Sequence, residues 1–168
     1  MDKRKLIGLA LAAVAVVALV LLLRPSESKR IRKVFATASS ELRKEGQEGL
    51  VIATAKAHAL SELVASGARF EVDGHTLRGI ASGRQLVQQI MLARAQADRI
   101  EVGFTDIAIA FDDDRTASVT ADVYVRGLSS ELGLSGRDAR ELEAVLKKDK
   151  DDGKWRFASV HLLPVVAK

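Results

Sequence analysis

The sequence predicts an α+β protein in which an N-terminal transmembrane helix precedes three helices packed on a curved, mainly antiparallel sheet. Three observations lead to this prediction. Residues 6–23 are uncharged and apolar throughout, residues 28–97 mostly repeat apolar side chains at helical spacing, and the residues from 100 onward alternate between apolar and polar. A period of 3.6 residues predicts helices, and a period of two predicts strands.

Residues 6–23 have the length and composition of a membrane anchor. They include only Leu, Val, Ile, Ala and Gly, and as a helix they reach about 27 Å, close to a hydrocarbon core of about 30 Å. A cleaved signal peptide needs small residues at its processing site, whereas residues 20–25 are mostly bulky. We therefore expect a basic flank at 1–5, a retained single-pass signal anchor at 6–23 and a basic juxtamembrane linker at 24–33.

The basic excess of the chain lies beside this apolar segment. The sequence has 26 Lys and Arg against 22 Asp and Glu, and residues 1–33 hold eight of the bases but two of the acids. The remainder lacks the basic surface that a nucleic-acid partner requires, so we expect none. Anionic lipid headgroups are the expected contacts of the bases after the segment, at about 1 kcal/mol each. These bases are Arg24, Lys29, Arg30, Arg32 and Lys33.

Two rules disagree about the side of the membrane on which the domain lies. Five bases follow the apolar segment and three precede it, which by the positive-inside count places the domain in the cytoplasm. A short basic head followed directly by the first apolar segment favours export, and long domains translocate largely regardless of charge. We expect export, and the absence of cysteine is compatible with either side.

Three helices are predicted after the anchor. The first begins after Pro25 and ends near Gly46, the second covers about residues 47–66, and the third runs from a cap at Ser82 to about Ala97. Each has one apolar stripe at steps of three and four residues. The stripes are Ile31, Val34, Phe35, Ala38 and Leu42; Leu50, Ala53, Ala57, Leu60 and Val64; and Leu86, Val87, Ile90 and Ala93.

Strands make up most of the remainder. Residues 68–72 with a turn at Asp73-Gly74 predict a short hairpin, and residues 100–111 with 117–126 predict a long one. Residues 138–148 fit a helix or a strand. We assign a strand because a tight-turn signature at 151–153 and a clear strand at 155–163 follow.

The order of these elements and the closing strand resemble the nuclear transport factor 2-like superfamily, which includes SnoaL-like proteins and has a cone-shaped, cystatin-like α+β fold. The final strand in such domains often has a turn Gly, a Trp, a further β-type residue and a His, as Gly153, Trp155, Phe157 and His161 do here. The resemblance covers about residues 28–166. With its anchor, the chain looks like uncharacterised members of the bacterial inner membrane, with the domain on the periplasmic side.

The resemblance implies that any functional group faces the interior of the cone. By alternation Trp155, Phe157, Ser159 and His161 share one face of the last strand, and in the superfamily this face often looks towards the cavity. They are the candidate pocket residues, and His161 is the best single catalytic candidate. A hydrogen-bonded core or rim histidine is the commoner alternative.

Tyr124 and Asp122 share a face of one strand and are the other catalytic candidates, although a surface position is more usual for such a pair. The three histidines, His58, His75 and His161, have no metal-site spacing and the chain has no cysteine, so no metal or cofactor is expected. The acidic run Asp112–Asp114 lacks the Gly and the distal Glu of a calcium loop and is expected at a hairpin tip.

The sequence favours a non-enzymatic domain that binds a small apolar ligand or a protein partner at the membrane surface. It has a tether but no convergent set of titratable groups. Two alternatives remain open: a small isomerase or lyase using His161 with Asp122 or Tyr124, and a structural module that forms a homodimer through its sheet.

Overall fold

Three helices and seven strands form the described part of the chain, which in this computed structural model comprises residues 26–72, 75–76, 83–127 and 140–163. The predicted anchor at 6–23 lies outside these residues. Among the helices that are described, none is long and apolar enough to cross a bilayer. The helices are α2 (Glu27–Leu42), α3 (Leu50–Glu62) and α4 (Gly83–Gln96).

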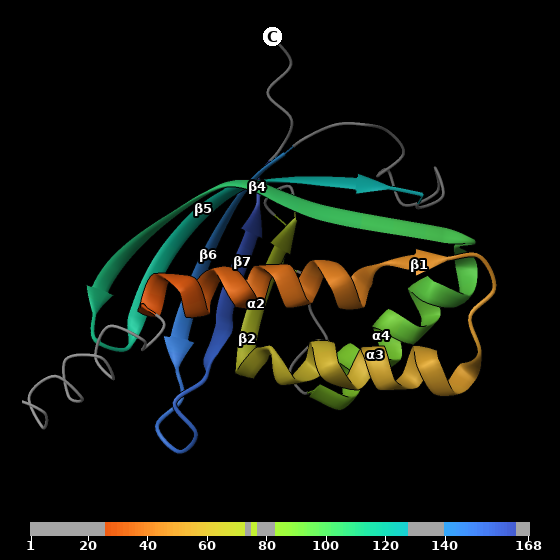
Figure 1. Cartoon of the computed structure of the whole chain (residues 1–168), viewed down its shortest axis with the longest axis horizontal. Helices are drawn as coiled ribbons and strands as arrows, with labels where there is room; N and C mark the ends of the chain where they lie inside the picture. Colours follow the sequence, from red (N-terminus) through yellow and green to blue (C-terminus); the bar gives the residue numbers. More distant parts are fainter. Residues whose placement is uncertain (1–25, 73–74, 77–82, 128–139, 164–168) are drawn as a thin grey trace, which may run out of the picture. The chain divides into compact units, whose positions relative to one another are not determined.

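The strands form one sheet in the order β1-β4-β5-β6-β7-β2-β3. All neighbours pair antiparallel except β2 and β7, which are parallel. Figure 1 shows the sheet curving behind α2. The strands are β1 (Lys44–Glu45), β2 (Val64–Val72), β3 (His75–Thr76), β4 (Arg99–Asp113), β5 (Thr116–Arg126), β6 (Arg140–Lys148) and β7 (Trp155–Leu162).

The predicted stripe of α2 forms the centre of the core. Ile31, Val34, Phe35 and Ala38 are buried against the sheet. The Phe35 ring meets Phe104 and Phe157 edge-on, with centroids 5.2 and 5.1 Å apart, an arrangement that aromatic quadrupoles favour. At its other face α2 exposes Arg32 and Lys33, so residues 27–33, predicted as a linker, are already helical.

The second predicted helix is shorter than expected. α3 ends at Glu62, and Val64, which was predicted to continue its stripe, opens β2 instead. Ala53, Ala57 and Leu60 face the interior as predicted, but Leu50 is 74% exposed. The prediction for Leu50 is wrong, because the first turn of α3 is exposed and burial of the stripe begins one turn later, at Ala53.

A buried arginine holds the three helices together. Arg94 of α4 is 2% exposed, and its guanidinium donates to a carboxylate oxygen of Glu48 and to the carbonyls of Glu41, Leu42 and Arg43. These carbonyls belong to the end of α2 and the residue after it, where helix carbonyls have no intrahelical partner. The guanidinium therefore caps α2 while it fixes the segment that leads into α3.

The hairpin predictions are confirmed. β4 and β5 pair around the tip at Asp113–Thr116, β2 and β3 pair around residues 73–74, and the ambiguous segment is the strand β6. Gly153 has a φ of 67° in the β6–β7 turn, a conformation that glycine adopts without strain. The turn is also held by Arg156, whose guanidinium contacts both Asp149 and Asp152.

Candidate functional site: an apolar pocket and an outer groove

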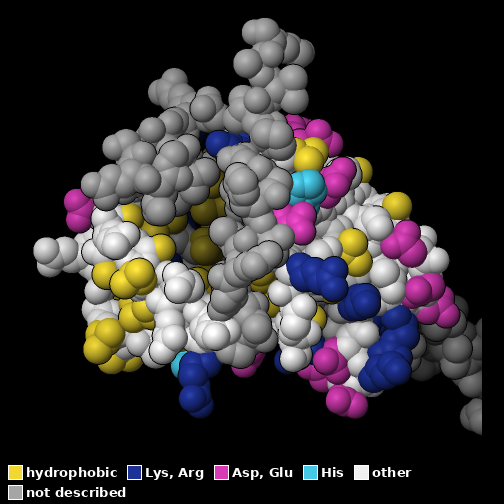
Figure 2. All heavy atoms as spheres, turned by 180° about the vertical axis from the view of Figure 1, so that it is seen from behind, with side chains coloured by type: hydrophobic (Ala, Val, Ile, Leu, Met, Phe, Trp, Pro, Cys, Tyr) yellow, Lys and Arg dark blue, Asp and Glu magenta, His cyan; other side chains and the backbone are white. Residues whose placement is uncertain are grey.

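An apolar pocket of about 220 Å³ lies between the helices and the sheet. In the view from behind, hydrophobic side chains lie at the bottom of a hollow (Figure 2). α2, α3 and α4 contribute to the pocket wall together with β2, β4, β6 and β7. The lining residues are Phe35, Ala38, Leu42, Leu60, Leu63, Val64, Phe70, Leu86, Ile90, Phe104, Leu142, Phe157 and Val160.

All of these lining side chains are hydrocarbon, which sets the chemistry of the pocket. A cavity without polar groups does not hold ordered water, and one of about 150 Å³ already admits benzene. The volume here is larger than that but below the roughly 300 Å³ at which pockets for drug-sized ligands begin. The pocket therefore fits a small apolar molecule or the end of a chain, and its described walls offer no acid or base.

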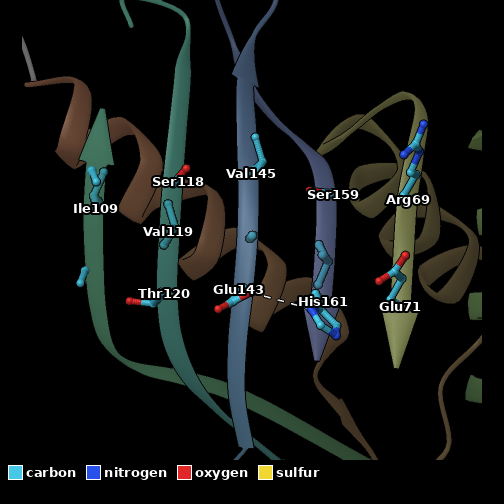
Figure 3. Close-up of a pocket in the computed structure, with 14 residues that line it drawn as sticks. Arg69, Glu71, Ile109, Ser118, Val119, Thr120, Glu143, Val145, Ser159 and His161 are labelled. Carbon is cyan, nitrogen blue, oxygen red and sulfur yellow. Dashed lines mark ion pairs between the residues drawn. The ribbon is translucent and has the colours of Figure 1, made fainter. Parts of the chain in front are cut away.

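A bulge in β7 separates the predicted pocket residues. Leu146 of β6 pairs with Phe157, but the preceding residue Val145 pairs with Ser159, so Ala158 is an extra residue in β7. An extra residue shifts the alternation of side chains from that point on. Trp155 and Phe157 are buried on the helix side, whereas Ser159 and His161 point to the opposite face of the sheet (Figure 3).

The prediction that these four residues share one face is therefore wrong. Phe157 lines the apolar pocket, and Trp155 is buried beside Phe111, with ring centroids 6.1 Å apart. Beyond the bulge, Val160 and Leu162 take the core positions that regular alternation would have given to Ser159 and His161.

His161 and Ser159 instead line an outer groove of about 620 Å³ on the other face of the sheet, where polar and aliphatic side chains are mixed. His161 pairs with Glu143 of β6 on one side and Glu71 of β2 on the other. Its Nδ1 is 3.8 Å from Glu143 Oε2, and the two side chains are 34% and 55% exposed. Figure 3 shows these residues with Arg69 on adjacent strands. The contact is longer than a hydrogen bond, so the two groups meet through charge only when the imidazole is protonated.

Tyr124 and Asp122 lie on the same outer face but apart from His161. They belong to β5, which β6 separates from β7, so two strand spacings of about 4.8 Å lie between them and the histidine. The Tyr124 ring covers Gly103 and is contacted by the Arg126 guanidinium, 5.4 Å from the ring centroid. The structure thus brings His161 together with Glu143, which the sequence reasoning did not select, and not with its predicted partners.

Other ionisable residues that the sequence analysis considered lie on the surface. His58 is exposed on α3, and Asp112–Asp114 are exposed around the β4–β5 tip. No group of His, Asp or Glu in the described ranges has the arrangement of a metal site.

Burial tends to raise the pKa of Glu48, but hydrogen bonds from Lys56 and Arg94 outweigh it, so the pKa is below its usual value.

Neither a protein-family model nor a curated protein matches the sequence, but solved structures share its fold. A Mycobacterium tuberculosis protein of unknown function is 20% identical, with 81% of this chain and 70% of that one aligned at a TM-score of 0.60. A candidate ketosteroid isomerase from Shewanella frigidimarina is 14% identical, with coverages of 77% and 91% and a TM-score of 0.52.

A candidate scytalone dehydratase from Novosphingobium aromaticivorans is also 14% identical, with coverages of 84% and 95% and a TM-score of 0.57. At such identities the similarity concerns the fold, which also serves unrelated activities. Three helices on one curved sheet, together with these neighbours, show that the described residues between 31 and 163 have the nuclear transport factor 2-like cone fold that the sequence predicts.

Proposed function

We propose that this protein is a membrane-tethered, non-enzymatic domain that binds a small apolar ligand in the pocket between its helices and sheet. The observation that carries the proposal is the composition of the pocket wall, in which every described lining side chain is hydrocarbon. Apolar surface gains about 25 cal/mol per Å² when water is removed from it. A ligand that fills the pocket would gain this free energy without leaving a polar group unpaired.

The tether in this proposal is the apolar segment 6–23. Lys29, Arg30, Arg32 and Lys33 follow it in the first turns of α2 and are exposed there, in a position to meet anionic headgroups. The tether would hold the domain beside a reservoir of apolar molecules, which raises their effective concentration at the pocket. The proposal places the protein in a bacterial inner membrane with the domain on the periplasmic side.

Saturable photolabelling tests the ligand part of the proposal. The full chain, reconstituted in nanodiscs, is irradiated with an octyl diazirine, and the labelled residues are mapped by mass spectrometry. We expect labelling at Phe35 and Phe104 that the unlabelled octyl compound suppresses. Labelling within the bilayer does not saturate and serves as an internal reference.

Two alanines of α2 provide a matched pair of variants. Ala38 lines the pocket, whereas Ala36, on the same helix, is exposed. Ala38→Leu should abolish the saturable labelling and Ala36→Leu should leave it unchanged, with circular dichroism reporting that both variants are folded. Saturable labelling that survives Ala38→Leu would contradict the proposal.

A small enzyme is the second candidate, and the contact between His161 and Glu143 is the observation that favours it. In this candidate function, the imidazole and the Glu143 carboxylate beside it move a proton to or from a molecule in the outer groove. His161→Gln separates the two candidates. We expect the variant to keep saturable labelling of the apolar pocket, because its side chain lies on the other face of the sheet.

A further inference from the structure

We infer that β4 accepts a strand of a partner protein along its free edge at residues 107–111, and that this partner strand has a basic residue at each end of an apolar run. The inference depends neither on the apolar pocket nor on the tether. In the sheet β4 lies between β1 and β5, but β1 covers only Arg99 and Ile100. Figure 1 shows the later part of β4 as the outermost of the described strands.

Residues 107–111 form an uncharged stretch between two irregular points of β4. Their sequence is Ile-Ala-Ile-Ala-Phe. The pairing with β5 is regular from Ala108 to Phe111 and shifts on either side of these residues. In an antiparallel pair only alternate residues bond to the neighbouring strand, so the others direct their N–H and C=O groups outward. No described strand pairs with these outward groups, and such an edge is a template for a further strand.

The same edge leaves apolar side chains partly uncovered. The Phe111 ring lies on the core side beside Trp155, with centroids 6.1 Å apart, yet Phe111 is 46% exposed. Ile107 and Ile109 also pack on the core and are half-buried. An added strand places a side chain beside each of these residues and removes apolar surface from water. Main-chain bonding and apolar burial therefore favour the same occupant.

Acidic side chains flank this stretch at both ends. Asp106 precedes it, and Asp112, Asp113 and Asp114 follow it, all of them exposed. Asp113 is used by the turn, where it accepts the backbone N–H of Arg115 at 2.6 Å. Within the described ranges no salt bridge joins Asp106, Asp112 or Asp114 to a base. A strand with Lys or Arg at each end would thus meet a carboxylate at each end.

The same charges disfavour a second copy of this chain as the occupant. The stretch is centred on Ile109, so two β4 strands that pair antiparallel over its whole length place Asp106 of each opposite Asp112 of the other. Like charges directly opposite each other are destabilising. Charges at an edge keep identical strands apart in this way, whereas a basic strand gains from them.

The spacing of the aspartates defines the partner strand further. Asp106 and Asp112 are six residues apart, which is about 20 Å along a strand. The bases of the partner therefore have five residues between them. Of these five, the residues that face Ile107, Ile109 and Phe111 are apolar, because they enter the core side of the sheet.

A synthetic peptide of this pattern tests the inference on the full chain, held in nanodiscs of phosphatidylcholine. The probe is a dye-labelled Lys-Val-Thr-Val-Thr-Val-Lys peptide, and its matched control is Glu-Val-Thr-Val-Thr-Val-Glu. We expect a saturable rise in fluorescence anisotropy with the basic peptide alone, and slower amide exchange at residues 107–111 when it is bound. Equal binding of the two peptides, or slowing only elsewhere in the chain, would overturn the inference.

N-methylation distinguishes strand addition from other kinds of binding. A strand that joins a sheet presents the N–H groups of alternate residues to it. One derivative of the basic peptide has N-methyl groups on its second and fourth residues, and another has them on its third and fifth. We expect one derivative to bind about ten-fold more weakly or worse, because two hydrogen bonds are lost, and the other to keep most of its affinity. Equal effects of the two patterns would show that the peptide does not bind as an added strand.

Two substitutions test the charge pattern in the protein. Asparagine tolerates the φ of 50° at Asp106 and keeps an acceptor for the Ser118 hydroxyl at Asp112. The combination of Asp106→Asn and Asp112→Asn should weaken the basic peptide about three- to ten-fold, since two opposite-charge pairs are lost. Asp151→Asn, in the exposed β6–β7 turn, should leave the affinity unchanged. An unchanged affinity in the double variant would remove the basis for a basic partner.

Amide exchange without peptide checks that the edge is free. If every amide of residues 107–111 already resists exchange in the full chain alone, the inference fails. Resistance that disappears on dilution would then assign the edge to a second copy, and resistance that persists would assign it to another segment of the same chain.

Discussion

Arg94 is the residue on which the arrangement of the helices depends most. Its guanidinium satisfies three main-chain carbonyls and the carboxylate of Glu48. A planar group with several donors in fixed directions suits this task, whereas an ammonium group cannot reach all four acceptors at once. Arg94 therefore has a structural role and lines neither the apolar pocket nor the outer groove.

Replacing this arginine should cost much of the stability of the domain. Arg94→Ala removes the guanidinium from the Glu41 and Leu42 carbonyls and leaves Glu48 with Lys56 alone, and breaking a buried pair in this way typically costs about 3–5 kcal/mol. Arg43→Ala is the matched control, since the side chains of Arg43 and Glu45 are 61% and 60% exposed and such pairs contribute about 0–1 kcal/mol. Urea unfolding measures the free energy of unfolding of both variants. Equal losses of stability in the two variants would contradict this structural role of Arg94.

The same cluster makes stability depend on pH. The pKa of Glu48 is lowered in the folded state because the donors Lys56 and Arg94 outweigh burial. A lowered folded pKa means that the carboxylate stabilises the fold above the unfolded pKa and that this contribution is lost as the pH falls towards the folded pKa.

We therefore expect the urea midpoint to fall as the pH drops below about 5, the range in which unfolded carboxylates bind protons. Glu48→Gln should lower the midpoint near neutral pH and flatten its dependence below pH 5. If the urea midpoint of the variant depends on pH as that of the wild type does and is only lower at every pH, Glu48 is not the group responsible.

At the level of elements, the outer sheet face is shaped by a glycine under an aromatic ring. A Cβ added to Gly103 of β4 would overlap Cζ of Tyr124 on β5, so alanine forces the ring to move. We expect Gly103→Ala to cost about 1–3 kcal/mol, as overpacking usually does.

In a Tyr124→Ala background the same change should cost little or should stabilise the strand, because alanine restricts the unfolded chain more than glycine does. A double-mutant cycle in urea measures the difference. An identical cost of Gly103→Ala in both backgrounds would show that the ring is not the obstacle.

Strand periodicity predicted the sheet but placed His161 on the wrong face. Regular alternation from Trp155 and Phe157 carries Ser159 and His161 to the core, whereas the bulge at Ala158 sends them outward. A signal was present in the sequence: the apolar spacing after Phe157 is three residues, to Val160, and then two, to Leu162.

β4 has the same spacing and the same outcome. Phe104, Ile107 and Ile109 all pack on the core, and the pairing with β5 shifts between Thr105 and Ala108, where Asp106 has a φ of 50°. An interval of three between apolar residues in a strand therefore predicts a bulge here. The pairing of His161 with Glu143 could not be predicted from regular alternation, because the bulge at Ala158 shifts the register of β7 against β6.

For the whole molecule, the fold class and most elements could be predicted because each has its own period and turn residues. The apolar pocket could not, because it is the space left between stripes on three helices and four strands, and no single segment encodes its volume. The exposed start of α3 was missed for a related reason. Leu50 continues the stripe of its helix, and only the position of the neighbouring elements decides that it remains in water.

The distribution of charge along the chain leads to the last prediction. In a chain that begins at Ser26, four bases remain to contact anionic lipid: Lys29, Arg30, Arg32 and Lys33. At about 1 kcal/mol each they supply about 4 kcal/mol, which corresponds to a dissociation constant near 1 mM. We expect such a chain to float with phosphatidylglycerol vesicles weakly at low salt and to be lost at high salt, where these charges are screened.

The full chain should stay with the vesicles in high salt and in alkaline carbonate, because residues 6–23 gain from hydrocarbon rather than from charge. If the shortened chain, shown to be folded by circular dichroism, remained bound at high salt, the domain and not the apolar segment would be the main source of membrane affinity.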